Sequence, residues 1–281
     1  LVAFLGYYAA VSSPLVREQA ASAKWYPSNF AGWDELAAAV AEARAQMPAG
    51  TQIVADNFKI GAELGFALGD PRIAVLDHPL NRDHGRAPQL RLWGLEAQGA
   101  RELAPGPVLL VVGTTDVKFS ELLAHYQSLC QRFGHLPHPE AVNIDHGGRR
   151  FLLLRFDGTA PEQSGTCATP AVAHLQEPAA GATVEREFRV FGWAVKDGVG
   201  VREVRLTLDG EVVATADYGQ ENRWVGEFLQ GRSNDPGQPA VAFSAQVDAS
   251  ALPAGDYWLG MEIEGADGSV ETWSERRIRL R

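Results

Sequence analysis

The sequence has few cysteines and lacks the short motifs that mark several common enzyme chemistries. Only two cysteines occur in 281 residues, too few for a four-cysteine metal centre. No Gly-x-Gly-x-x-Gly or P-loop pattern is present, which argues against a nucleotide cofactor. No Gly-x-Ser-x-Gly, His-Glu-x-x-His or Cys-x-x-Cys pattern occurs either, so nucleophilic and zinc-dependent hydrolysis have no support. We therefore expect no metal and no cofactor.

Clusters of basic residues and long apolar runs are also missing. The 35 acidic residues outnumber the 25 basic ones, giving a net charge of -10. Without a basic cluster to neutralise phosphates, we expect no nucleic-acid partner. The opening stretch 1–13 is apolar for about a dozen residues, short of the ~20 that span a membrane, and lacks the basic start of a signal peptide. It is either the end of a spanning helix or an ordinary buried first element.

The two cysteines, Cys130 and Cys167, leave two possibilities open. A single disulfide between them would tie the segment 159–169 to the first domain and restrict the unfolded chain. Two independent reduced thiols are the alternative, unless the compartment is oxidising.

Residues 24–158 alternate between helical and buried-strand patterns. A helix is expected from Trp33 to Met47, followed by strands at 52–56, 72–77 and 108–113 and helices at 58–68 and 119–133, the last ended by Gly134. This alternation is typical of a three-layer α/β domain with a mostly parallel sheet. A hairpin at 141–156, turning at His146-Gly147-Gly148, is expected to close the domain.

The character of the sequence changes after residue 158. Residues 159–172 are rich in Thr, Pro, Gly and Ser and are expected to form a linker, with 1–23 a membrane-helix end or connecting segment. Residues 173–281 hold short alternating runs separated by Asp-Gly turns and show no helix pattern. They predict an all-β sandwich of immunoglobulin type. Its expected core includes Trp193, Phe243 and Trp258.

Polar side chains follow two of the expected strands. The apolar runs 53–55 and 73–76 end in Asp56-Asn57 and Asp77-His78, and ligands bind at this edge of open α/β sheets. Nearby groups that could bind a metal or transfer protons are Asp56, Glu63, Asp77, His78, Asp83 and His84. The alternative is that Asp56 and Asp77 cap the following turns or helices.

A loop rich in Arg and Gln is expected to follow. Its candidate groups for hydrogen bonds to a phosphate or sugar are Arg82, Arg86, Gln89 and Arg91. Trp93 could stack on a sugar ring, or anchor the loop in the core.

Three segments resemble the extracytoplasmic C-terminal region of bacterial membrane glycosyltransferases. They are KWYPSNFAGWDELA at Lys24–Ala37, VADNFKIGAELGFALG at Val54–Gly69 and HGRAPQLRLW at His84–Trp93. The superfamily includes dolichyl-phosphate-mannose protein mannosyltransferases and the aminoarabinose transferase of lipid A, and the resemblance covers residues 24 to about 157. The segment 188–219 is similar to bacterial immunoglobulin-like modules, which imply architecture rather than a reaction.

The resemblance implies a parent enzyme that moves a sugar from a polyprenyl phosphate to an acceptor at the periplasmic face of the bacterial inner membrane. It implies that Leu1–Val11 ends the last spanning helix, that a Cys130–Cys167 disulfide forms in the periplasm, and that the partner is the transmembrane part of the same polypeptide. The family's catalytic carboxylates lie near the first membrane helices, so no catalytic residue is assigned here. The candidate contacts for donor or acceptor are Asp56, Asn57, Glu63, His78, Arg86, Gln89 and Trp93.

Two other functions stay open on the sequence alone. The chain could be a non-catalytic module whose sandwich binds glycan or protein at the cell surface. It could also be a soluble hydrolase that uses Asp56 and His78.

Overall fold

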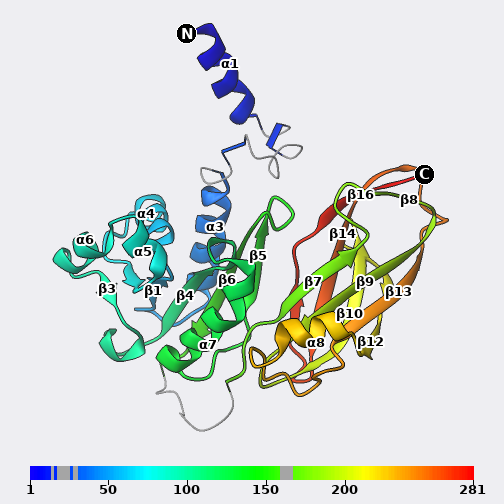
Figure 1. Ribbon diagram of the computed structural model, residues 1–281. Helices are drawn as coiled ribbons and strands as arrows, with labels where there is room; N and C mark the ends of the chain where they lie inside the picture. Colours follow the sequence, from blue (N-terminus) through cyan, green and yellow to red (C-terminus); the bar gives the residue numbers. More distant parts are fainter. Residues whose placement is uncertain (14–15, 18–25, 28–30, 159–166) are drawn as a thin grey trace.

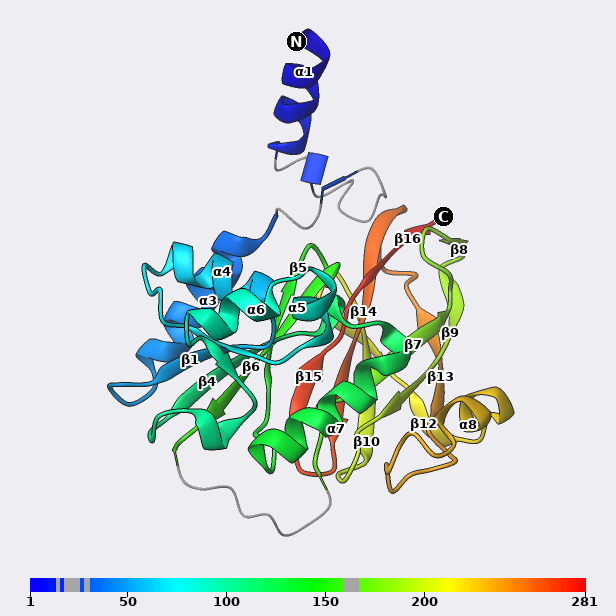
Figure 2. The same cartoon turned by 60° about the vertical axis from the view of Figure 1, so that its left-hand side comes forward.

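The computed structural model describes residues 1–13, 16–17, 26–27, 31–158 and 167–281, and Figure 1 shows their arrangement. Lys24, Ser28, Asn29 and residues 159–166 of the expected linker lie outside the described residues. Helix α1 (Val2–Val11) projects away from the rest of the molecule in both views (Figures 1 and 2) and buries none of its side chains. Among the described residues, no helix is long and apolar enough to cross a membrane.

A six-stranded mixed sheet organises residues 33–156. Its elements are α3 (Trp33–Ala45), β1 (Gln52–Ala55), α4 (Phe58–Ala67), β2 (Ala74–Leu76), α5 (Pro79–Asp83), α6 (Ala87–Leu92), β3 (Glu96–Ala97), η2 (Ala100–Glu102), β4 (Val108–Gly113), η3 (Thr114–Asp116), η4 (Phe119–Glu121), α7 (Leu122–Phe133), β5 (Glu140–Ile144) and β6 (Arg149–Phe156). The strand order is β3-β2-β1-β4-β6-β5. Strands β3, β2, β1 and β4 run parallel, whereas β6 is antiparallel to both β4 and β5.

The expected fold class, a three-layer α/β domain with a mostly parallel sheet, is therefore wrong. The described chain is dominated by sixteen strands in three sheets, which are mixed or antiparallel. The sequence pattern locates strands but does not encode the direction in which they pair. The β5–β6 pairing is antiparallel because a tight turn at 145–148 reverses the chain between the two strands, and β6 also pairs with β4 in the antiparallel direction.

Individual elements nevertheless follow the sequence closely. Strand β4, the α3 start at Trp33, the β5–β6 hairpin and the end of α7 at Gly134, whose φ is +81°, confirm the expectations for those segments. The stretch expected as a polar loop instead holds the short helices α5 and α6, each with a proline in its first turn. Proline there removes no helical hydrogen bond and presets φ.

Small residues allow α4 to approach the sheet closely. A Cβ on Gly61 would lie 2.6 Å from Cγ2 of Val75, so only glycine permits this packing. Ile60 and Leu64 of the same helix enter the core formed with α3, β1 and β4, whereas α7 packs with Val54 and Leu110. Alternate residues of β1 thus bury against different helices, which follows from the two-residue period of a strand.

Residues 172–280 form a two-sheet sandwich, which confirms the sandwich expectation in its general form. Its elements are β7 (Val172–Glu177), β8 (Thr183–Val184), β9 (Glu187–Val195), β10 (Val201–Leu208), β11 (Glu211–Thr215), β12 (Asp217–Gln220), α8 (Arg223–Leu229), β13 (Ala242–Asp248), β14 (Gly255–Gly265), β15 (Val270–Thr272) and β16 (Arg276–Leu280). The sheets have the orders β12-β13-β9-β7 and β11-β10-β14-β16-β8, with β15 paired to β14. Helix α8 contradicts the expectation that this half has no helix.

The two halves share a core and a buried ionic contact. Apolar residues of α7 and the mixed sheet cluster with Val172, Trp193 and Leu229 of the sandwich half. Glu271 of β15 pairs with Arg150 of β6 and with Lys196. Trp193 and Phe243 are buried as expected, but Trp258 is only partly buried. Its ring stacks 3.6 Å from that of His146 in the hairpin turn, so it belongs to the contact between the halves.

The disulfide alternative is confirmed. Cys130 of α7 is bonded to Cys167, which precedes β7. The bond therefore links the helix that covers the mixed sheet to the start of the sandwich.

Candidate functional site

The polar residues expected at the sheet edge do lie there, at the ends of β1 and β2. The parallel pairing of these strands sets Ala55 beside Val75, so the residues that follow each strand emerge near one another. Asp56 and Asn57 are fully buried, and His78 is almost fully buried. Such burial is unusual for a carboxylate and requires partners.

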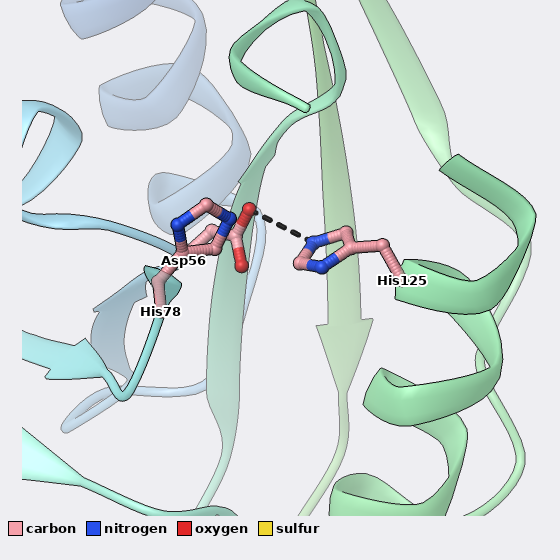
Figure 3. A group of neighbouring side chains, drawn as sticks. All are labelled: Asp56, His78 and His125. Atoms are coloured by element: carbon pink, nitrogen blue, oxygen red, sulfur yellow. Dashed lines mark hydrogen bonds and ion pairs between the residues drawn. The ribbon is translucent and has the colours of Figure 1, made fainter. Parts of the chain in front are cut away.

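Asp56 lies between two imidazole rings (Figure 3). Its Oδ2 is 3.1 Å from Nε2 of His125, which comes from α7. The rings of His78 and His125 are 5.2 Å apart, centroid to centroid, in an edge-on arrangement. The other carboxylate oxygen, Oδ1, has no hydrogen-bond partner among the described residues. We refer to Asp56, His78 and His125 as the Asp-His-His cluster.

The charges in this cluster follow from burial and proximity. Burial alone would raise the pKa of Asp56, but the nearby His125, His78 and Arg132 outweigh it and lower that pKa. Burial by itself would lower the pKa of His125. The charge of Asp56 and its hydrogen bond to the ring together outweigh burial, so the pKa of His125 is raised. Burial dominates at His78 and lowers its pKa. These shifts favour the charged forms of Asp56 and His125 and the neutral form of His78.

A hydrogen bond fixes the tautomer of His78. Its Nδ1 accepts the backbone N–H of Leu80 at 3.1 Å, which caps the start of α5. An acceptor nitrogen carries no proton, so in the neutral ring the proton is on Nε2. Asn81 of α5 joins the same region to α4, donating to the Leu76 carbonyl at 2.8 Å and accepting from the Phe58 amide at 2.9 Å.

Asn57, rather than Asp56, caps α4. Its side-chain oxygen accepts the amides of Lys59 and Ile60, and its Nδ2 donates to Asp116 at 3.0 Å. The helix that follows β2 is likewise capped by His78 and not by Asp77, which instead pairs with Arg82. The expectation that Asp56 and Asp77 cap these helices is therefore wrong, because in each case the next residue along the chain is the cap. The side chain of Asp56 is therefore available to contact the two histidines.

Replacing Asn57 by alanine is expected to lower the free energy of unfolding by about 1–2 kcal/mol. The change removes two cap hydrogen bonds and the bond to Asp116. Urea denaturation measures the loss. Asn222→Ala, which removes a similar cap from α8 with exposed surroundings, should cost less. An equal or smaller loss for Asn57→Ala would contradict the role of the Asp116 bond.

Arg86, Gln89 and Trp93 lie at a different place, a groove between α4 and α6. The groove has a volume of about 770 Å³, within the ~300–1,000 Å³ range of ligand sites. Phe58, Gly61, Ala62, Gly65 and Phe66 line its α4 side, together with apolar residues of β2 and α6. Trp93 is 60% exposed, which removes the alternative that it anchors the loop in the core. We call this hollow the α4–α6 groove.

Two arginines border the α4–α6 groove without an ionic partner. No described carboxylate forms an ion pair with Arg72 or Arg86. The Arg86 guanidinium lies 5.9 Å from the ring centre of Phe58. Asp70 also borders the groove, but its carboxylate lies 3.8 Å from the guanidinium of Arg44. A groove with apolar walls and guanidinium groups at its margin suits an amphiphile with an anionic end.

The remaining candidates are dispersed. Glu63 faces a separate hollow beneath α1, shared with Tyr8 and Arg17. Asp83 and His84 are exposed, and Arg91 pairs with Glu96 at 3.5 Å. The structure therefore brings together Asp56 with His78, and Arg86 with Gln89 and Trp93, but does not unite all seven candidate contacts. His125 was missed because it is far along the chain and no spacing pattern connects it to the sheet edge.

No family model matches the sequence, and no curated protein matches it. Solved structures share only distant similarity. The fibronectin(III)-like modules of Clostridium thermocellum CbhA match 38% of this chain and 93% of theirs, at 14% identity and a TM-score of 0.26. An endo-β-1,4-mannanase from Thermotoga petrophila matches 44% of this chain and 21% of its own, at 9% identity and a TM-score of 0.27. CopC from Methylosinus trichosporium OB3b matches 41% of this chain and 92% of its own, at 13% identity and a TM-score of 0.22.

Proposed function

We propose that the chain is the extracytoplasmic region of a membrane glycosyltransferase that takes its sugar from a polyprenyl phosphate. In this proposal it is non-catalytic by itself and lies at the periplasmic face of the bacterial inner membrane. It covers the active site carried by the transmembrane part of the same polypeptide and binds the lipid-linked donor or acceptor.

The α4–α6 groove is the observation that carries this proposal. Two of the three segments that resemble these transferases, Val54–Gly69 and His84–Trp93, supply its two sides. Its apolar walls suit an isoprenoid chain, and the guanidinium groups of Arg72 and Arg86 suit a phosphate. Gln89 adds an amide that can bond a sugar hydroxyl or a phosphate oxygen.

Helix α1 supports attachment to a membrane. Its apolar side chains, Phe4, Leu5 and Tyr8 among them, are exposed. Phe66, which is 89% exposed, borders both the α4–α6 groove and the hollow beneath α1. The groove and the apolar helix therefore lie on adjoining surfaces, as lipid access would require.

Two further observations support the finer parts of the proposal. Disulfides persist mainly in oxidising compartments, so the Cys130–Cys167 bond supports a periplasmic location. The strand orders β7-β9-β13-β12 and β10-β14-β16 follow the A-B-E-D and C-F-G orders of immunoglobulin-type sandwiches, which supports that assignment for the second half.

Farnesyl phosphate, a short isoprenoid phosphate, is expected to bind the purified chain at one site in isothermal titration calorimetry. Farnesol and inorganic phosphate should each bind more weakly, because each makes only part of the contacts. Arg86→Gln and Trp93→Ala are expected to weaken binding about tenfold each, through loss of a charge-assisted hydrogen bond and of apolar contact.

Arg223 and Trp224 of α8 provide a matched control. They form a similar exposed arginine–aromatic pair, with the guanidinium 5.9 Å from the ring centre. Arg223→Gln and Trp224→Ala should leave farnesyl phosphate binding unchanged. Failure of the native chain to bind, or equal losses in both pairs of variants, would refute the role of the groove.

A further inference from the structure

The Asp-His-His cluster has the composition of a site for a divalent metal ion. Two imidazoles and one carboxylate are a ligand set that zinc and other first-row transition metals use in proteins. One possible ligand atom from each of Asp56, His78 and His125 lies within 4.8 Å of the other two. We propose that this cluster binds one Zn²⁺ or similar first-row divalent ion, independently of the proposed transferase function.

The unpartnered oxygen of Asp56 is the second observation that points to a ligand. Asp56 is fully buried, yet its Oδ1 has no hydrogen-bond partner among the described residues. A buried carboxylate oxygen without a donor loses its hydration at a considerable cost in free energy. A bound cation would supply the missing interaction.

The positions of the three residues are set by regular elements. Asp56 follows β1 and its amide bonds to the Val111 carbonyl at 2.9 Å, His78 begins α5, and His125 is on α7. Metal–ligand bonds of ~2.0–2.2 Å separate the ligand atoms of a tetrahedral site by about 3.4 Å. Oδ2 of Asp56 and Nε2 of His125 are already 3.1 Å apart, and an ion held by these two atoms would take the place of the proton between them. One possible ligand atom of His78 lies within 4.8 Å of a ligand atom of each of the other two residues.

Two nearby groups act against the binding of a cation at this cluster. His78 accepts the Leu80 amide through Nδ1, and binding a metal through Nε2 requires it to give up that bond. Arg132 places a positive charge near Asp56, but its donors are directed at the carbonyls of Asp77, Ala97 and Gln98. It therefore does not occupy the free Asp56 oxygen.

The side chain of His125 is 12% exposed, which leaves the cluster a route to solvent. Three protein ligands leave the fourth tetrahedral position for water. An ion held there would also join the ends of β1 and β2 to α7, so binding should raise the melting temperature.

Calorimetric titration with ZnCl₂, and the visible absorption of the chain loaded with Co²⁺, test the proposal. One ion per chain is expected, with tetrahedral Co²⁺ absorption and a raised melting temperature. His125→Gln and Asp56→Asn should each weaken binding at least about tenfold. Circular dichroism checks that each variant is folded.

His146 gives a matched control, because its Nδ1 also lies against a carboxylate, Glu275, at 2.6 Å. His146→Gln should bind Zn²⁺ as the native chain does. The absence of binding by the native chain overturns the proposal whether or not the variants fold. Binding that survives in His125→Gln but is lost in His146→Gln also overturns it.

Discussion

Replacing Glu271 by alanine is expected to lower the free energy of unfolding by about 3–5 kcal/mol. Glu271 is almost fully buried between the two halves of the chain. Its carboxylate pairs with Lys196 at 2.5 Å and lies 3.7 Å from Arg150. Both oxygens also accept the Ala171 amide, at 3.0 and 3.1 Å.

The loss is large because two buried cations would remain. Arg150 and Lys196 are almost fully buried, and Nη1 of Arg150 already lacks a hydrogen-bond partner among the described residues. Removing their shared anion leaves both charges uncompensated in a medium that solvates them poorly. The conservative change Glu271→Gln also removes the anion, but it keeps an oxygen that can accept the Ala171 amide or the Lys196 ammonium, so it should cost less than Glu271→Ala.

Urea denaturation followed by circular dichroism measures this effect. Glu227 serves as control, since it pairs with Arg223 on the exposed surface of α8 at 2.8 Å. Glu227→Ala should cost only about 0.3–0.5 kcal/mol. Losses of similar size at Glu227 and Glu271 would show that the buried contact does not hold the two halves together.

Removing the disulfide is expected to cost about 3–4 kcal/mol. The bond joins residues 37 positions apart, and closing a loop of that length restricts the unfolded chain by this amount in the chain-entropy treatment. Cys130→Ala combined with Cys167→Ala removes it without placing a hydroxyl group in the buried surroundings of Cys130.

Reduction provides an independent comparison. Dithiothreitol should lower the unfolding free energy of the native chain by a similar amount and leave the double-alanine variant unchanged. If the variant were as stable as the oxidised native chain, the disulfide would not contribute to stability.

The sequence predicts the positions of elements well wherever periodicity is strong. Strand β4 is a continuous apolar run with every residue buried, and the α3 pattern ends at the Pro48-Ala49-Gly50 stretch. The direction in which strands pair does not follow from this periodicity. It is set by long-range contacts such as β4–β6, which the local pattern of Val108–Gly113 does not encode.

The short helices were missed for a local reason. Helix α5 has five residues and is capped by a histidine nitrogen, an uncommon N-cap. Its polar sequence suggests a loop because one turn of helix shows no periodicity. Helix α8 has only seven residues and also shows no clear periodicity, although Asn222 provides a conventional cap.

The candidate site was only partly accessible from sequence. The apolar run before Asp56 and the one before His78 identified the sheet edge, and Arg86 and Gln89, which the sequence indicated as candidate contacts in a polar loop, border the α4–α6 groove. The third member of the cluster, His125, comes from a helix on the other side of the sheet edge, and only tertiary packing brings it to Asp56.

The coding sequence immediately upstream of Leu1 tests the central claim, attachment to a membrane transferase, most directly. The proposed function predicts several apolar segments of ~20 residues there, with the carboxylate-bearing loop of the transferase near the first of them. A start codon, or a cleavable signal peptide directly before Leu1, would contradict it.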